Sequence, residues 1–344
     1  MTTGQSDGGP VAGRVAGPGR AVAIFVKLAV GALLLYMLIN RVDVAALGQA
    51  LIHANIGAVV LAVIGLTFTV SLNALRWRII VGQLGGRVSA QTALAGTFEG
   101  MFFNLFLPTI VGGDAVKAVL LARETGAPAR ATMSVFMERN TGLCALLAVA
   151  LVAAYDAPAV HLFGVSLVAL VWLLSLGYVI ANVTLMSPMA YHLVDRVIAA
   201  TPLSRMRPRA ATLYQAVAPY KAAVPTLAAA LVLSLAFQLL VIAVVFLNAR
   251  ALNLVVPISA VAVFVPLVSL AGMVPVSVNG LGVREALYIL LFGQIGVTAE
   301  VAVSLALLYL AVTVVASLPG GVVYALQRTP LGITAAGEAA PDLH

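Results

Sequence analysis

Charged side chains are scarce in this chain of 344 residues, because Asp, Glu, Lys and Arg together make up only 9% of it. An average soluble domain contains roughly 25% charged residues. This deficit, together with a hydrophobic content of 62%, excludes a water-soluble globular protein. The hydrophobic residues gather in runs of about 17 to 25, which are long enough to cross a hydrocarbon core of roughly 30 Å. The sequence therefore predicts a polytopic membrane protein.

Cysteine and histidine are also nearly absent. The one cysteine, Cys144, lies inside a hydrophobic run, so it cannot form a disulfide within the chain and is interpreted as a small core side chain. The four histidines, at positions 53, 161, 192 and 344, lack the spacing of metal ligands. Neither a G-x-S-x-G motif nor a P-loop occurs. We therefore expect no catalysis, no ATP hydrolysis and no cofactor.

The chain divides into one membrane domain and two tails. Residues 1–20, rich in Gly and Pro, and residues 329–344 are predicted to be disordered tails, which leaves 21–328 as a single transmembrane domain. Its first hydrophobic run ends in Asn40-Arg41 rather than at a small-residue cleavage site, so a retained span is expected rather than a signal peptide. The further hydrophobic segments are Ile56–Leu75, Thr92–Leu107, Thr132–Ala154, His161–Met186, Pro225–Leu247, Val256–Val274 and Val301–Leu326.

Proline and glycine break two hydrophobic stretches in a similar way. Leu107-Pro108 is followed by Gly112-Gly113-Asp114 and Lys117, and Val274-Pro275 is followed by Asn279-Gly280-Leu-Gly282-Val-Arg284-Glu285. Matching interrupted segments in two halves are typical of an inverted repeat with a binding site near the membrane middle. We therefore predict an all-α transmembrane bundle with two inverted repeats, at about residues 54–154 and 225–326. Each repeat contains a broken helical hairpin that is expected to be re-entrant.

Loop charges set the predicted orientation. If both hairpins return to the side they came from, one side holds the two tails and residues 76–91, 117–131 and 187–224. These inner segments contain fourteen Lys and Arg, five of them in 187–224, whereas the outer loops contain only Arg41 and Arg250. Cations favour the cytoplasmic side. Both termini are therefore predicted to be cytoplasmic, in a bacterial-type inner membrane.

The basic connector 187–224 is too polar to span a membrane. Leu193, Val194, Val197 and Ile198 recur in it at helical spacing beside several arginines, which fits a helix lying on the inner leaflet. A solvated connector between the two halves explains the same pattern equally well.

Ionisable residues at membrane depth are expensive, so each is a candidate for function by default. Asp114 and Lys117 are three residues apart and could pair on one helix face. Glu138 and Arg139 are adjacent, which favours partners on other helices. The alternative to a functional role is a set of structural ion pairs that stabilise a broken helix.

The glycines permit a second interpretation of the breaks. Gly112-Gly113 and Gly280-Leu-Gly282 precede expected helices, whose free N–H groups and positive dipole end can bind a phosphate. Tight turns without a ligand need the same glycines. Arg76 either anchors its span at the interface or receives an anionic head group. The candidate substrate-binding residues are Arg76, Glu99, Asn104, Gly113, Asp114, Lys117, Glu138, Arg139, Asn279, Gly280, Arg284 and Glu285.

Over roughly residues 25–328 the chain resembles the lysylphosphatidylglycerol synthase transmembrane region, or flippase-like, family. The residues that carry the resemblance are Arg76-Trp77-Arg78, Asn104 to Lys117, Glu138-Arg139, Pro275, Asn279 to Glu285 and Leu318-Pro319-Gly320-Gly321. Lys117 departs from the arginine that members often have, which keeps the charge but loses the two-donor fork. We expect no soluble aminoacyl transferase domain of the kind that the bifunctional synthases carry, so lysyl transfer is not implied.

The resemblance implies an integral inner-membrane protein that binds or translocates a lipid with a charged head group. Stand-alone members also occur with envelope glycolipid, isoprenoid or hopanoid pathways, so the lipid stays open. The first hypothesis is a lipid translocase. The second is a non-transporting scaffold that docks a lipid-modifying enzyme or a glycosyltransferase. Nucleic acid is not an expected partner.

Overall fold

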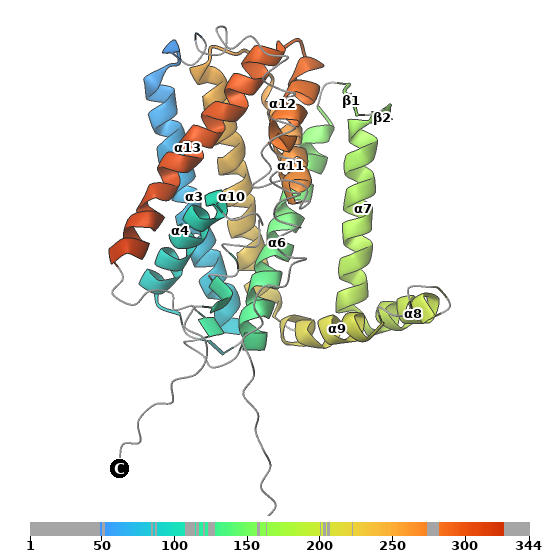
Figure 1. Ribbon diagram of the computed structural model, residues 1–344. Helices are drawn as coiled ribbons and strands as arrows, with labels where there is room; N and C mark the ends of the chain where they lie inside the picture. The colour runs from blue at the N-terminus through green and yellow to red at the C-terminus, as the bar shows by residue number, and fades with distance from the viewer. Residues whose placement is uncertain are drawn as a thin grey trace, which may run out of the picture.

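The computed structural model is helical over most of the chain. It describes residues 49, 52–83, 85–86, 88–106, 114, 117–119, 121–122, 128–156, 159–162, 164–199, 201, 204, 207–221, 223–273 and 282–326. Within these ranges, five helices are long and hydrophobic enough to cross a membrane. They are α3 (Ile56–Gln83), α6 (Pro128–Ala154), α7 (Leu167–Met186), α10 (Val224–Ala251) and α13 (Ala299–Leu326). The five helices run in alternating directions between the same two ends of the molecule (Figure 1).

The described part of the bundle also contains three shorter helices: α4 (Ala90–Phe106), α11 (Ile258–Met273) and α12 (Val283–Gly293). At 1.5 Å per residue, the 16 residues of α11 cover only about 24 Å, less than a hydrocarbon core of about 30 Å. α4 lies in the half of the bundle at which α3 ends, whereas α11 and α12 lie in the opposite half (Figure 1). The predicted breaks at 107–113 and 274–281 lie outside the described residues.

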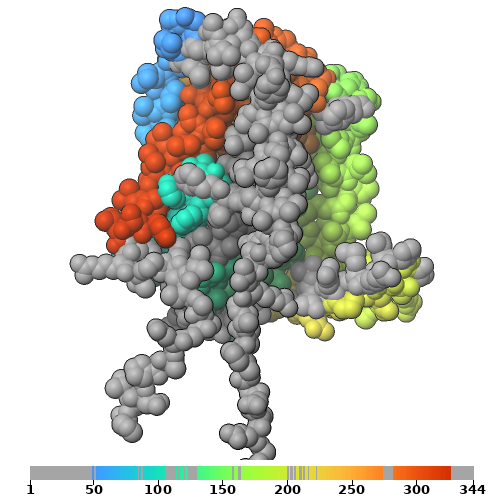
Figure 2. Space-filling model, viewed as in Figure 1, coloured from blue at the N-terminus to red at the C-terminus, as the bar shows by residue number. Residues whose placement is uncertain are grey.

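Close helix contacts hold the short elements in place. α13 lies beside α4 (Figures 1 and 2), and a Cβ atom at Gly320 would lie 2.1 Å from the carbonyl oxygen of Phe98. The two backbones therefore touch, which only glycine allows at this point. α11 and α12 meet through Phe264 and Phe292, whose rings pack edge to face with centroids 5.1 Å apart.

The segment predicted from His161 to Met186 is not one continuous helix. It begins with two short antiparallel strands, β1 (His161–Leu162) and β2 (Val165–Ser166), and the helix starts only at Leu167. Gly164 lies between the strands with a φ of 81°, a left-handed conformation that turns the chain back on itself. Hydrophobicity alone did not distinguish this hairpin from a first helical turn.

The basic connector is largely helical and lies across the end of the bundle. Helices α8 (Pro188–Ala199) and α9 (Arg207–Lys221) run nearly perpendicular to the spanning helices (Figure 1), which confirms the helical spacing seen around Leu193. We call α8 and α9 the arm. The arm lies at the same end as the start of α6 and the end of α3, so the predicted inner segments share one side in the described part of the chain.

Candidate functional site

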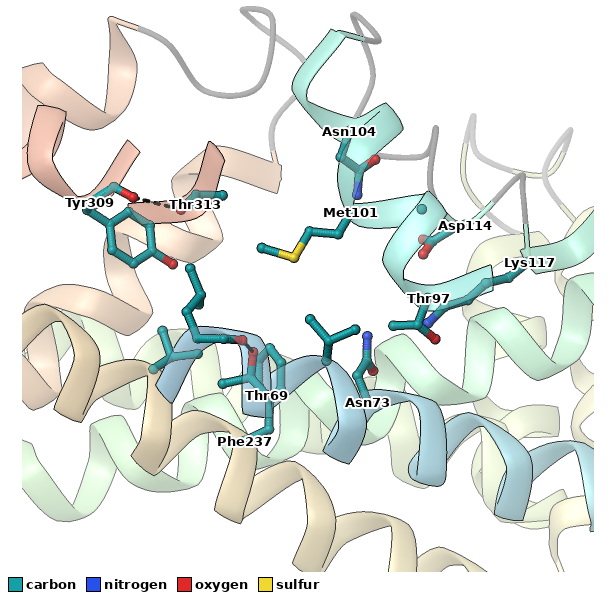
Figure 3. Close-up of a pocket in the computed structure, with 14 residues that line it drawn as sticks. Thr69, Asn73, Thr97, Met101, Asn104, Asp114, Lys117, Phe237, Tyr309 and Thr313 are labelled. Atoms are coloured by element: carbon teal, nitrogen blue, oxygen red, sulfur yellow. Dashed lines mark hydrogen bonds between the residues drawn. The ribbon is translucent and has the colours of Figure 1, made fainter. Parts of the chain in front are cut away.

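A cavity of about 220 Å³ opens between α3, α4, α10 and α13. Because liquid water occupies about 30 Å³ per molecule, this is room for about seven waters. The residues that line it are Leu66, Thr69, Val70, Asn73, Thr97, Gly100, Met101, Asn104, Asp114, Lys117, Phe237, Val241, Tyr309 and Thr313. We call this cavity the central pocket; Figure 3 shows its lining.

Helical periodicity explains how the polar lining arises. Thr69 and Asn73 are four residues apart on α3, and Tyr309 and Thr313 are four apart on α13, so each pair shares one helix face. Both helices are otherwise strongly hydrophobic and turn these faces toward the pocket. A polar face on a membrane-spanning helix normally faces a cavity or a partner rather than lipid.

Two ion-pair groups stand at one end of the pocket. The Nζ of Lys117 donates to Oε1 of Glu138 at 2.7 Å, and Nη2 of Arg76 approaches the same oxygen at 3.3 Å. Arg139 pairs with Asp114. Three cations and two carboxylates thus meet across α3, α6 and the segment that follows α4.

The predicted pairing of Asp114 with Lys117 is corrected by these contacts. Asp114 pairs with Arg139, and Lys117 pairs with Glu138. Neighbours three apart on a helix form only a weak pair, and α6 supplies a closer partner for each. The expectation that Glu138 and Arg139 find partners on other elements is confirmed.

Arg76 is not an interfacial anchor. Its guanidinium is buried and donates to Oδ1 of Asn73 at 2.6 Å and to Oγ of Ser234 at 2.9 Å, besides its contact with Glu138. Gly142 leaves the room for this group, since a Cβ there would lie 3.2 Å from Nη1 of Arg76. Arg76 therefore stands behind the pocket wall, where it orients Asn73.

The threonine hydroxyl groups of the pocket already donate hydrogen bonds within the protein. Thr69, Thr97 and Thr313 each donate to a carbonyl of their own helix, at 2.6, 2.7 and 2.7 Å. Their remaining capacity is to accept hydrogen bonds. Asn73 is the reverse case, because its oxygen is occupied by Arg76 and its amide nitrogen points toward the cavity (Figure 3).

The pocket therefore has two chemically different ends. Asp114, Lys117 and Asn73 lie at the charged end, and Tyr309 and Thr313 lie at the opposite, uncharged end (Figure 3). The charged end can hold an ionic group, while the uncharged end can accept hydrogen bonds from hydroxyl or amino groups. Among the described residues, no group of three or more His, Cys, Asp or Glu could hold a metal ion.

The second broken segment has a different local arrangement. The N–H of Gly282, whose φ is 81°, donates to Oε2 of Glu285 at 2.6 Å, and Arg284 donates to Oε1 at 3.0 Å. The carboxylate of Glu285 thus occupies the helix start that the glycines offer as a phosphate site. The guanidinium carbon of Arg284 lies 6.0 Å from the ring centroid of Tyr309, on α13.

The structure places the other candidates as follows. Asn104 lines the central pocket, and Glu99 is fully buried on α4 without lining it. Gly113, Asn279 and Gly280 lie outside the described residues. The sequence interpretation missed Thr69, Asn73, Thr97, Tyr309 and Thr313, and the available signal was their polar spacing on hydrophobic helices.

The chain matches a known protein family, although no individual curated protein matches it. The family model described as Lysylphosphatidylglycerol synthase TM region matches residues 24–320, which is most of the chain. A transmembrane region is what this family model describes, and the described part of the structure contains five helices of spanning length. The chain is therefore a multi-pass membrane protein that belongs to the lysylphosphatidylglycerol synthase transmembrane region family.

Proposed function

We propose that this protein is a lipid translocase that binds a lipid head group in the central pocket and moves it across the inner membrane. The observation that carries the proposal is a polar pocket, charged at one end, inside a bundle of spanning helices. Polar groups are expensive at membrane depth unless they serve a partner or a cargo. A head group can enter such a pocket while its hydrocarbon tails stay in the surrounding lipid.

The two ends of the pocket favour a head group with two parts. Lys117 and Asp114 suit a phosphate or an ammonium group at the charged end. The acceptor oxygens of Thr69 and Thr313, together with the hydroxyl of Tyr309, suit a distal group that carries O–H or N–H donors. A charged phosphodiester lipid with a hydroxylated or aminated head group satisfies both ends.

The opposite placement of the short helices supports an alternating-access path. α4 lies in one half of the bundle, and α11 and α12 lie in the other, as inverted repeats require. Tyr309 lines the pocket and also faces Arg284 of the second broken segment. We take Tyr309 as the point at which the two half-paths meet, with Arg284 offering the next cation to a passing anionic group.

Neither a cofactor nor a chemical step is part of this proposal. The described charged residues of the pocket are held in ion pairs that suit binding, and the cargo leaves chemically unchanged. The side with the arm is assigned to the cytoplasm because its loops carry most of the cations.

A reconstitution experiment tests the proposal. Liposomes with the purified protein receive phospholipids labelled on a short acyl chain, so that the head group stays intact, and a membrane-impermeant reductant bleaches the label on the outer leaflet. The parent protein is expected to raise the fraction of label that becomes accessible. A scaffold would leave this fraction at the level of protein-free liposomes, which would overturn the proposal.

Matched variants locate the activity in the pocket. Asn73→Leu and Thr313→Val are expected to slow translocation, since each removes a polar atom from the lining. Thr184→Val is the control, because Thr184 makes the same type of bond to its own helix, at 2.8 Å to Ile180, on the exposed side of α7. Equal rates for all three variants and the parent would place the transport path elsewhere.

A further inference from the structure

The exposed face of α8 combines two stripes of side chains. Met189, Leu193 and Val197 recur every four residues and are 86%, 63% and 59% exposed. His192 and Arg196, also exposed and four residues apart, follow Met189 and Leu193 at a spacing of three. Residues three and four apart are neighbours on a helix surface. A hydrophobic stripe therefore runs directly beside a cationic one.

The arm is held in a defined position. The rings of Tyr191 and Tyr214 stack with centroids 4.1 Å apart and join α8 to α9. Arg207 of α9 donates two hydrogen bonds to Asp195 of α8, at 2.8 and 2.6 Å. These contacts lie away from the Met189 stripe and leave it uncovered by α9.

The charge of the arm is strongly one-sided. Asp195 is the only acidic residue in positions 187–224, which contain five Lys and Arg. Asp195 is paired with Arg207, and Arg196 makes no ion pair within the described part of the arm. Such a surface attracts anions, and an anionic leaflet attracts basic segments that lie close to it.

The place of α8 in the fold indicates that the partner of its exposed face is a membrane lipid. α8 begins directly after α7 ends at Met186, and it runs across the bundle axis (Figure 1), as a helix at the head-group level does. Ser187, Met189, Ala190, His192, Leu193 and Arg196 line a hollow of about 570 Å³ at this corner. Its lining offers a cation and a hydroxyl for a phosphate, and hydrophobic side chains for an acyl chain.

We infer that this face of α8 is a binding site for an anionic phospholipid of the adjoining leaflet. The phosphate lies against Arg196 and His192, and the acyl chains lie along Met189, Leu193 and Val197. A solvated connector would expose three large hydrophobic side chains to water instead. The site is separate from the central pocket, so the lipid bound here is a resident partner of the protein and not its cargo.

The first test measures retained lipid. The full chain is reconstituted in bilayer discs of phosphatidylcholine with phosphatidylglycerol, extracted under gentle conditions and weighed by native mass spectrometry. Arg196→Gln is expected to bind phosphatidylglycerol about fivefold more weakly, the change that corresponds to one cation lost at an anionic surface. Arg196→Lys should bind as the parent does. Arg250→Gln removes a cation at the opposite end of the bundle and is the matched control.

The second test measures where α8 lies. A fluorophore on Val197→Cys, made with Cys144→Ser to remove the native thiol, is compared for quenching by spin-labelled phosphatidylglycerol and by aqueous iodide. Stronger quenching by the lipid is expected. Stronger quenching by iodide, or equal lipid retention by Arg196→Gln and Arg250→Gln, would overturn the inference whether or not the protein translocates lipid.

Discussion

The carboxylate of Glu138 lies between two cations that come from different elements. Lys117 and Arg76 both reach its Oε1, and all three side chains are buried. Removing one member of such a group is costly because it leaves an uncompensated charge away from water. The ion pairs therefore fix the geometry of the charged end of the pocket, and they also limit which substitutions the protein tolerates.

The Asp114–Arg139 pair gives a prediction at the residue scale. A double-mutant cycle with Asp114→Asn and Arg139→Gln, read from thermal unfolding in detergent, is expected to give a coupling energy of about 1 kcal/mol or more. The same cycle on Asp114 and Lys117 should give a smaller value, because Lys117 pairs with Glu138. A larger coupling between Asp114 and Lys117 than between Asp114 and Arg139 would contradict the observed pairing.

Asp195 gives a prediction about pH. The hydrogen bonds from Arg207 lower the pKa of Asp195 below its ordinary value of about 3.9. A group whose pKa is lowered by folding contributes stability above its unfolded pKa and loses it as pH falls through the folded value. The contact between α8 and α9 should therefore persist at pH 4 and be lost only in stronger acid.

Spin labels on exposed positions of α8 and α9 check this expectation through their separation. In Arg207→Gln the ion pair is absent at every pH, so the labels should already be further apart at neutral pH than in the parent, and acid should separate them no further. The same acid-induced separation of the labels in both proteins would show that the ion pair does not hold the arm.

At this scale the sequence identified the charged residues but not the polar neutral ones. Asp114, Lys117, Glu138 and Arg139 were found because charge in a hydrophobic segment is rare. Thr69 and Thr313 escaped notice because threonine is common in spanning helices, where it bonds to its own backbone. Only the meeting of four helices makes these residues one surface, and that meeting cannot be inferred from any one of them.

At the scale of elements, the contact of α13 with α4 depends on a glycine pair with unequal neighbours. A Cβ at Gly320 would lie 2.1 Å from the backbone oxygen of Phe98, whereas one at Gly321 would lie 2.8 Å from the side-chain ring of Phe102. A ring can rotate away, but a helix backbone cannot move without moving the whole element. The two positions should therefore differ in their tolerance of a methyl group.

Gly320→Ala is expected to lower the free energy of unfolding by about 1–3 kcal/mol, the usual cost of overpacking, and Gly321→Ala by less. Thermal unfolding in detergent measures both. Gly177→Ala is the control, since a Cβ at Gly177 on α7 meets nothing within 4 Å, so stability should stay equal or rise. An equal loss at positions 177 and 320 would refute the close contact of α4 with α13.

Element boundaries followed hydrophobicity well where a helix is long. The predicted segments at 56–75, 132–154 and 225–247 all lie within α3, α6 and α10. The β1–β2 hairpin was missed because its residues are as hydrophobic as the helix that follows them. Within the described residues, the failures are therefore at the ends of elements, where turn geometry rather than burial decides the structure.

At the scale of the whole molecule, basic residues distinguish the two ends of the bundle. The arm end holds Arg196, Arg207 and Lys221, and the opposite end holds Arg250. The five spanning helices run in alternating directions between these two ends. The pairing of segments by side could be predicted from charge counts once both broken hairpins are taken to return to the side they came from, because cations are retained on the cytoplasmic side during insertion.

The orientation itself leads to the last prediction, which uses thiol labelling in intact cells. Cys144→Ser removes the native cysteine, and single cysteines then replace Arg207 on the arm and Tyr155, which is 97% exposed at the opposite end. A membrane-impermeant maleimide should label position 155 in intact cells, and position 207 only after the membrane is permeabilised. The positive-inside rule requires this result, because turning the molecule over would place the five cations of 187–224 outside. Labelling of position 207 in intact cells, with position 155 protected, would reverse the assigned orientation. It would also place the α8 lipid site in the outer leaflet and make the half containing α11 and α12 the cytoplasmic entrance to the central pocket.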